Sequence, residues 1–297
     1  MSDTKRGASE TGRANVSRRE FLEHTATAGG VAVMTAAASG CVAAQDDKKR
    51  SSSEQKTPAG TSSAPAGTMV EYRSVEMMIP AYLSRTKRAV ASGSVLVIHE
   101  VFGLNDHIKS IADRFANEGY LALAPNFFVR ASEPPPKDAS DIAALRKAAS
   151  SIPTEVAIKD MQAGLDFLKT FSSVRPRLAS IGFCMGGGYS YQLATHTKDL
   201  ACAVIFYGRT PLELVPQVSC PLLGIFGELD QGIPPEKVKE FEAALKKAGK
   251  EAEIKIYPEA GHGFFNDTRP AAYRAEAAAD AWQRTLKFFR EHLGAAS

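Results

Sequence analysis

The sequence predicts an α/β fold with a mostly parallel central sheet, helices on both faces of that sheet, and no large cap domain. From Met69 onward, short runs rich in β-branched and aromatic residues alternate with longer segments of helical periodicity. Most of the short runs are continuously apolar, as strands that are buried on both faces must be. A chain of 297 residues that is 44% hydrophobic is also long enough for one large domain with a well-buried core.

The expected strands and helices alternate along this domain. Short apolar runs predict strands at 72–79, 94–99, 120–124, 178–183, 202–207, 222–226 and 252–257. Apolar residues at helical spacing predict helices at 106–118, 143–149, 154–170, 186–196, 235–248 and 271–292. The last two helices each begin beside a proline, which suits a first helical turn. Three prolines at 134–136 indicate a surface loop before helix 143–149.

Residues 1–44 are predicted to be an export signal of the twin-arginine type. Arg18 and Arg19 precede an uncharged stretch, 25–45, that is rich in Ala, Gly and Thr. Such a stretch gains too little free energy from hydrocarbon to favour a membrane anchor, so we expect a cleaved, periplasmic or cell-surface protein. The alternative is a chance Arg-Arg pair before an alanine-rich helix. Cys41 follows a weak lipoprotein pattern, and its lipidation would give the only membrane contact that we expect.

Residues 45–68 are polar and rich in Ser, Pro, Lys and Thr, which predicts a disordered linker before the domain at 69–297. Residues 1–68 hold nine of the 36 Lys and Arg residues and seven of the 33 Asp and Glu residues, which leaves 27 basic and 26 acidic residues in the domain. This balance offers no basic surface for nucleic acid.

The four cysteines, Cys41, Cys184, Cys202 and Cys220, have neither C-x-x-C pairs nor metal-ligand spacing, so no zinc site is expected. Cys202 and Cys220 stand at the starts of strands that we expect to be neighbours. They could therefore form a disulfide in an oxidising compartment.

The segment Gly182-Phe183-Cys184-Met185-Gly186-Gly187-Gly188 carries the strongest functional signal. It lies between an expected strand and an expected helix and has the pattern of a nucleophile elbow with cysteine in the serine position. The sharp turn strains the central residue, so the flanking positions must be glycine. The N-terminus of the following helix favours a thiolate. A phosphate loop would need a Gly-Lys-Ser/Thr ending, and a structural cysteine would not require glycines on both sides.

A carboxylate and a histidine follow this cysteine in the chain order of an elbow triad. Asp230 lies in the turn after strand 222–226, and His262 lies in the loop after strand 252–257. Taken alone, Asp230 could be an ordinary turn residue and His262 an ordinary loop histidine. Because the carboxyl ends of parallel strands meet at one edge of a sheet, we expect both residues to converge on the cysteine. Glu228 is the alternative acid.

The segment His99-Glu100-Val101-Phe102-Gly103-Leu104-Asn105 does not indicate a zinc protease, because the second histidine of that motif is missing. Together with the elbow and with Gly261-His262-Gly263-Phe264, this segment resembles the dienelactone hydrolase family. The resemblance runs from about Met69 to the C-terminus and implies the α/β-hydrolase fold.

The resemblance implies a triad of Cys184, Asp230 and His262, with no metal or organic cofactor. It also implies that the Glu100 carboxylate holds the resting thiol and turns to deprotonate it when substrate binds. The expected activity is hydrolysis of a small lactone or ester through a cysteine thioester, by a monomer or small homo-oligomer. The alternatives are an exported carboxylesterase or acyltransferase of the same fold, and an inactive surface binding protein.

The resemblance also assigns residues that contact the substrate. The backbone N–H groups of Val101 and Met185 would bind the oxyanion. The best-known members carry a substrate-binding arginine four residues after the histidine, where this chain has Asn266. An asparagine brings no charge, so we expect weaker preference for a carboxylate-bearing lactone unless another arginine supplies the charge. The candidates for that arginine are Arg130, Arg146 and Arg209.

Overall fold

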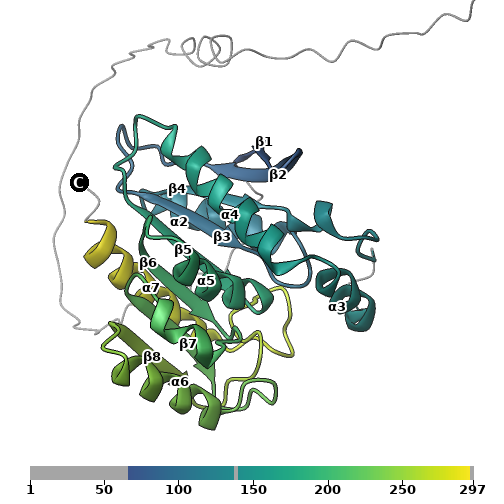
Figure 1. Cartoon of the computed structure of the whole chain (residues 1–297), viewed down its shortest axis with the longest axis vertical. Helices are drawn as coiled ribbons and strands as arrows, with labels where there is room; N and C mark the ends of the chain where they lie inside the picture. The colour runs from purple at the N-terminus through teal and green to yellow at the C-terminus, as the bar shows by residue number, and fades with distance from the viewer. Residues whose placement is uncertain (1–65, 137–139, 295–297) are drawn as a thin grey trace, which may run out of the picture. The chain divides into compact units, whose positions relative to one another are not determined.

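The computed structural model describes residues 66–136 and 140–294, which contain one eight-stranded sheet (Figure 1). From β1 to β2 and from β2 to β4 the pairing is antiparallel, and all further neighbours are parallel. The predicted fold class is therefore confirmed. The predicted export signal, Cys41 and nearly all of the predicted linker lie outside the described residues. In spatial order the strands are β1 (Thr68–Ser74), β2 (Met77–Ser84), β4 (Leu121–Pro125), β3 (Ser94–Ile98), β5 (Leu178–Phe183), β6 (Leu200–Phe206), β7 (Leu222–Gly227) and β8 (Ala252–Tyr257).

The hairpin of β1 and β2 corrects the prediction of a single strand at 72–79. Val75 and Glu76 have φ angles of 22° and 59°, and they turn the chain between the two strands. Turns of this kind usually carry Asn or Gly, which have little steric cost at positive φ. Neither residue is present here, so the turn left no mark in the sequence pattern. β1 also begins at Thr68, the last residue of the predicted linker.

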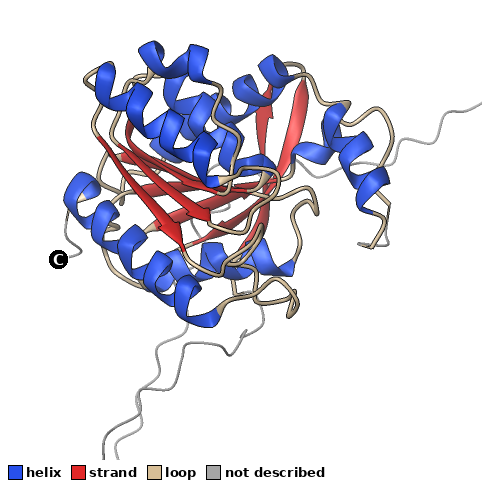
Figure 2. Cartoon of the chain, turned by 90° about the horizontal axis from the view of Figure 1, so that it is seen from below, coloured by secondary structure: helices blue, strands red, loops and turns tan. Residues whose placement is uncertain are grey.

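Helices cover both faces of the sheet, as Figure 2 shows. Apolar side chains of α2 (Asp106–Asn117) and α7 (Ala275–Leu293) share one buried cluster, and those of α4 (Thr154–Lys169), α5 (Met185–His196) and α6 (Pro235–Lys247) share the other. α7 begins four residues after its predicted start, because residues 271–274 form turns that close on Arg269 and Phe264. The remaining helical segments are η1 (Phe127–Arg130), α3 (Ile142–Ser150) and η2 (Leu212–Gln217).

Two further observations concern the buried cysteines and the membrane. Cys202 and Cys220 are both buried free thiols, so the disulfide considered between them is not formed in this structure. Burial raises the pKa of both thiols. None of the described helices is long and apolar enough to cross a membrane.

Candidate active site

Cys184 occupies the sharp turn between β5 and α5. Its φ and ψ angles are 55° and −115°, and its N–H donates to the carbonyl of Phe206 at 3.0 Å. The turn brings backbones so close that a Cβ added at Gly182 would lie 1.9 Å from the carbonyl oxygen of Gly186. A Cβ at Gly186 would lie 2.3 Å from the carbonyl oxygen of Ile98. The glycines around Cys184 are therefore sterically required, and the cysteine stands in the strained geometry of a nucleophile elbow.

Asp230 and His262 meet at the carboxyl edge of the sheet, after β7 and β8. Nδ1 of His262 lies 2.7 Å from Oδ2 of Asp230, and His262 and Cys184 both line the cavity described below. The Asp230 carboxylate also accepts the backbone N–H groups of Gly232 at 2.8 Å and Ile233 at 3.1 Å. The structure thus brings together the three side chains that chain order and strand position predicted. Glu228, the alternative acid, is exposed and does not line the cavity described below.

The ionisation of this pair follows from its hydrogen bonds. Burial would raise the pKa of Asp230, but the hydrogen bonds from His262 and from two backbone N–H groups outweigh burial and lower it. Burial would lower the pKa of His262, but the bonds with Asp230 and Cys184 outweigh it and raise the pKa to about 10. The imidazolium form is therefore favoured between its carboxylate partner and the sulfur.

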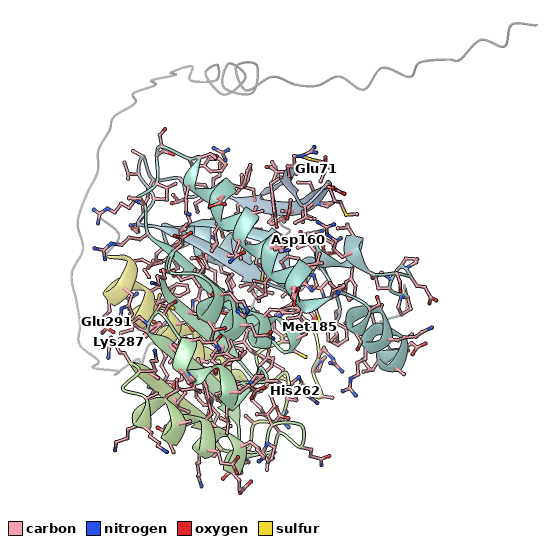
Figure 3. All side chains as sticks on the ribbon, in the orientation of Figure 1. Glu71, Asp160, Met185, His262, Lys287 and Glu291 are labelled. Carbon is pink, nitrogen blue, oxygen red and sulfur yellow. The ribbon has the colours of Figure 1, made fainter. Side chains whose placement is uncertain are left out.

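A cavity of about 870 Å³ opens beside these residues. Its wall includes Cys184, His262, Val101 and Met185, and Figure 3 labels two of them, Met185 and His262. Met185 is the first residue of α5, so its N–H has no acceptor within the helix. The two residues predicted to form the oxyanion hole thus lie at the cavity with the candidate nucleophile. The volume is in the range of small-molecule sites.

Glu100 does not hold the thiol of Cys184 here. Its side chain is almost completely buried, and its Oε2 accepts a hydrogen bond of 2.7 Å from Nδ2 of Asn266. Burial raises the pKa of this carboxylate, against the opposing effects of His107 and of the Asn266 hydrogen bond. No hydrogen bond joins Glu100 to Cys184 among the described residues.

Asn266, predicted to contact the substrate, lies beside Glu100. The side chain is 1% exposed and is not part of the cavity wall. Its Oδ1 accepts the backbone N–H and the hydroxyl of Thr268 at 3.1 and 2.7 Å, while its Nδ2 binds Glu100. Both polar ends of Asn266 are thus hydrogen-bonded within the protein in this structure.

The three candidate arginines differ in their position relative to the cavity. Arg146 of α3 and Arg209, three residues after the end of β6, line the cavity. Arg130 instead binds the Asp160 carboxylate with Nε at 2.9 Å and Nη2 at 2.7 Å, away from the cavity. The positive charge predicted to be missing at position 266 is therefore available from two other elements.

Sequence reasoning missed Tyr207. This residue directly follows β6, has a φ angle of 39°, and is completely buried, yet it forms part of the cavity wall. Its ring centroid lies 5.1 Å from that of His262. Tyr207 is the last residue of the strand predicted at 202–207. Its place at the carboxyl end of a parallel strand, directly before Gly208, was the signal that could have found it.

No cluster of three metal-ligating side chains occurs within the part of the chain that the structure describes.

Comparison with known proteins agrees with this geometry. The Dienelactone hydrolase family matches residues 79–293. A protein of Escherichia coli O157:H7 named "Putative carboxymethylenebutenolidase" is 37% identical over 232 residues, which are 73% of this chain and 83% of that protein. A Saccharolobus solfataricus protein of the same name is 37% identical over 234 residues, which are 66% of this chain and 88% of that protein. The crystal structure of a "Putative Dienelactone Hydrolase" from Klebsiella pneumoniae has a TM-score of 0.72 and 32% identity, and covers 76% of this chain and 98% of its own. The chain belongs to the dienelactone hydrolase family.

Proposed function

We propose that this chain hydrolyses small lactones or esters through a thioester on Cys184. One observation carries the proposal: Cys184 stands at positive φ in the wall of a cavity, beside a His262–Asp230 pair. A purely structural cysteine has no need of a strained backbone or of a hydrogen-bonded imidazole. A nucleophile needs both, because the strain exposes the sulfur and the imidazole accepts its proton.

The reaction proceeds in two halves. The Cys184 sulfur, whose proton has moved to Nε2 of His262, attacks the carbonyl carbon, and the N–H groups of Val101 and Met185 stabilise the oxyanion by about 3 kcal/mol each. The tetrahedral intermediate collapses to a thioester as His262 gives its proton to the leaving enolate or alkoxide oxygen. His262 then takes a proton from the water that attacks the thioester. The carboxylic acid product leaves, and Asp230 keeps the imidazole oriented throughout.

The two cavity arginines favour a substrate that carries a carboxylate. Arg146 and Arg209 come from different elements, and both line the cavity that contains Cys184. A guanidinium binds a carboxylate in two parallel hydrogen bonds, which gives orientation as well as free energy. Leu229 at the same wall is 59% exposed and offers apolar contact to the rest of a small molecule.

Replacement of Cys184 tests the nucleophile. Cys184→Ala is expected to reduce ester hydrolysis to background, because no other side chain reaches the same position on the elbow. Mass spectrometry of wild type with a slowly hydrolysed lactone should detect the acyl group on the peptide that contains Cys184. The matched control is Cys220→Ala, which removes a buried cysteine outside the cavity wall and should leave turnover unchanged. Turnover above a few per cent in Cys184→Ala would contradict the proposal.

Replacement of the arginines tests the substrate class. Arg146→Gln and Arg209→Gln are each expected to lower kcat/KM for a carboxylate-bearing lactone by roughly tenfold or more, since a charge-assisted bond is worth about 1.5–3 kcal/mol. A neutral lactone of similar size should be affected much less. Arg73→Gln, on the exposed face of β1, is the control. Equal losses for both substrates would show that neither guanidinium recognises a carboxylate.

A further inference from the structure

The edge of the sheet formed by β1 carries a large share of the exposed apolar side chains. β1 ends the sheet and pairs only with β2 (Figure 1). Seven large hydrophobic side chains are exposed among the described residues, and four of them lie on this hairpin: Met69, Val75, Met77 and Met78. An edge strand also presents N–H and C=O groups that can pair with a strand of another chain. Apolar side chains beside such an edge mark a candidate interaction surface.

The backbone of Glu71 faces this free edge. In the hairpin, Glu71 lies opposite Pro80, which has no N–H, and the carbonyl of Pro80 accepts the N–H of Asn126 at 2.8 Å. Pro80 therefore directs its backbone towards β4, so the N–H and C=O of Glu71 point away from β2. Because this direction alternates along an antiparallel pair, Met69 and Arg73 also direct their N–H and C=O groups outwards. These three residues offer donors and acceptors to a further strand.

The chain before β1 does not cover this edge where the structure describes it. The N–H of Ala66 donates to the Asp113 carboxylate at 2.8 Å, which directs the chain onto α2 on one face of the sheet. On the other face, the hydroxyl of Tyr72 donates to the backbone carbonyl of Asp160 at 2.9 Å, and this buried contact holds β1 to α4. β1 is thus held firmly, with its edge uncovered by the described chain.

The exposed side chains of β1 have a self-complementary order. Met69, Glu71 and Arg73 share one face of the strand, and Val75 follows in the turn. Figure 3 labels Glu71 at the rim of the domain. Glu71 and Arg73 are both exposed, and neither forms an ion pair with any side chain that the structure describes.

This order favours pairing with a second copy of the strand. An antiparallel copy related by a two-fold axis at Tyr72 would place Glu71 opposite the partner's Arg73 and Met69 opposite the partner's Val75. Opposite charges in facing positions stabilise a strand pair, and like charges destabilise it. A two-fold axis at Glu71 or at Arg73 would instead place like charges opposite each other. The charges therefore select one register.

The opposite edge of the sheet lacks these features. On β8, Glu253 already pairs with Arg284 of α7 at 2.9 Å, and the ammonium group of Lys255 lies 5.4 Å from the ring centroid of Tyr257. None of the seven exposed large hydrophobic side chains belongs to β8. The charges of this edge are thus used within one molecule, whereas those of β1 are available to another.

We propose that two copies of this chain pair antiparallel through β1, about a two-fold axis at Tyr72, and so form one continuous sheet across a homodimer. Glu71 and the partner's Arg73 then exchange backbone hydrogen bonds in both directions, and their side chains form an ion pair. The axis repeats every contact, as in other isologous interfaces. No residue of β1 or β2 lines the cavity, so pairing leaves the candidate active site open. The inference does not depend on the chemistry proposed for Cys184.

Charge reversal on β1 tests the interface, with sedimentation velocity of the full chain over a range of protein concentrations. Wild type is expected to dimerise at micromolar concentrations. Arg73→Glu places like charges opposite each other at two symmetry-related positions, so the dissociation constant should rise by about tenfold or more. Glu71→Arg should have the same effect, and turnover per subunit should stay unchanged in both. The control is Lys239→Glu, which changes the charge equally at an exposed residue of α6 and should leave the dimer intact.

The double variant of Glu71→Arg with Arg73→Glu separates this register from general damage to the strand. The exchange keeps opposite charges facing each other, so the dissociation constant should return to near the wild-type value. Hydrogen exchange of the β1 peptide gives a second readout, because pairing protects the outward N–H groups.

Three results would overturn the proposal. The first is a wild type that stays monomeric at every concentration, whether its β1 amides exchange quickly or are protected by the N-terminal segment of the same chain. The second is a dimer that survives both single reversals, which would place the contact on another surface. The third is a double variant that remains as dissociated as the single variants.

Discussion

Asp230 and His262 each depend on the other for their ionised form. The Asp230 side chain is 1% exposed, whereas the His262 side chain is 42% exposed, so solvent reaches only the histidine. The folded-state pKa of His262 lies above its unfolded value of about 6.5. As long as Asp230 is ionised, the stabilisation from the His262 charge is therefore fully present below about pH 6.5, and it is lost as the pH rises through about 10.

We expect this pH dependence to appear in the free energy of unfolding. The difference between wild type and His262→Ala should shrink as the pH is raised from 6.5 to 10, by no more than about 1 kcal/mol because solvent screens the exposed imidazole. Urea unfolding at each pH measures it. Asp230→Asn is the control, since the neutral amide removes the attraction and should flatten the dependence. A difference that grows with pH would contradict the assigned sign.

The ion pair of Arg130 and Asp160 joins three elements on one side of the sheet. Figure 3 labels Asp160, which lies on α4 and is completely buried. Arg130 ends η1 and also donates from Nη2 to the carbonyls of Ser74 and Val75 in the β1–β2 hairpin. The hydroxyl of Tyr72 donates to the backbone carbonyl of Asp160. The hairpin that the sequence did not predict is thus fixed to the domain by polar contacts, of which the Tyr72–Asp160 bond is buried.

Removal of one partner should be costly at this position. Arg130→Ala leaves a buried carboxylate without its cation, so we expect a loss of about 3–5 kcal/mol in the free energy of unfolding. The exposed pair of Lys147 and Glu133 provides the control, and Lys147→Ala should cost less than about 1 kcal/mol. Denaturant unfolding of both variants gives the comparison. If both variants lost a similarly small free energy of unfolding, water would be replacing Arg130 as the partner of the Asp160 carboxylate.

The elements that follow simple patterns were predictable from sequence. β5 and β8 have the predicted bounds, because each is a short run of strand-forming residues with clear ends. The hairpin was not predictable, since its turn residues carry no turn signature. Cys184, Asp230 and His262 were predictable because local motifs and chain order mark them. The contact between Glu100 and Asn266 spans 166 positions in sequence, and no local pattern encodes which partner a buried carboxylate chooses.

On the scale of the whole molecule, the described domain begins at residue 66 and the expected signal lies before it. We propose that the domain acts outside the cytoplasm. Changing Arg18 and Arg19 together to Lys should retain the protein in the cytoplasm, because the export receptor reads the guanidinium pair rather than charge alone. Fractionation with an antibody to the domain measures the distribution, and Arg13→Lys is the control. Equal export of the double variant would refute the signal.

The crowding of backbone around Cys184 also limits how this protein can evolve. Added Cβ atoms would lie 1.9 Å from backbone at Gly182, 2.3 Å at Gly186 and 2.3 Å at Gly208. A side chain at any of these three glycines would clash with backbone, so we expect substitutions there to be eliminated. Replacement of Cys184 by Ser, in contrast, changes only the sulfur atom to oxygen. Homologues that descend from this gene can therefore change the nucleophile or the residues that face the ligand, while the three glycines stay the same. We expect changes of substrate in this lineage to arise in α3 and the loops, where substitutions of cavity residues such as Arg146 and Leu229 leave these three glycines in place.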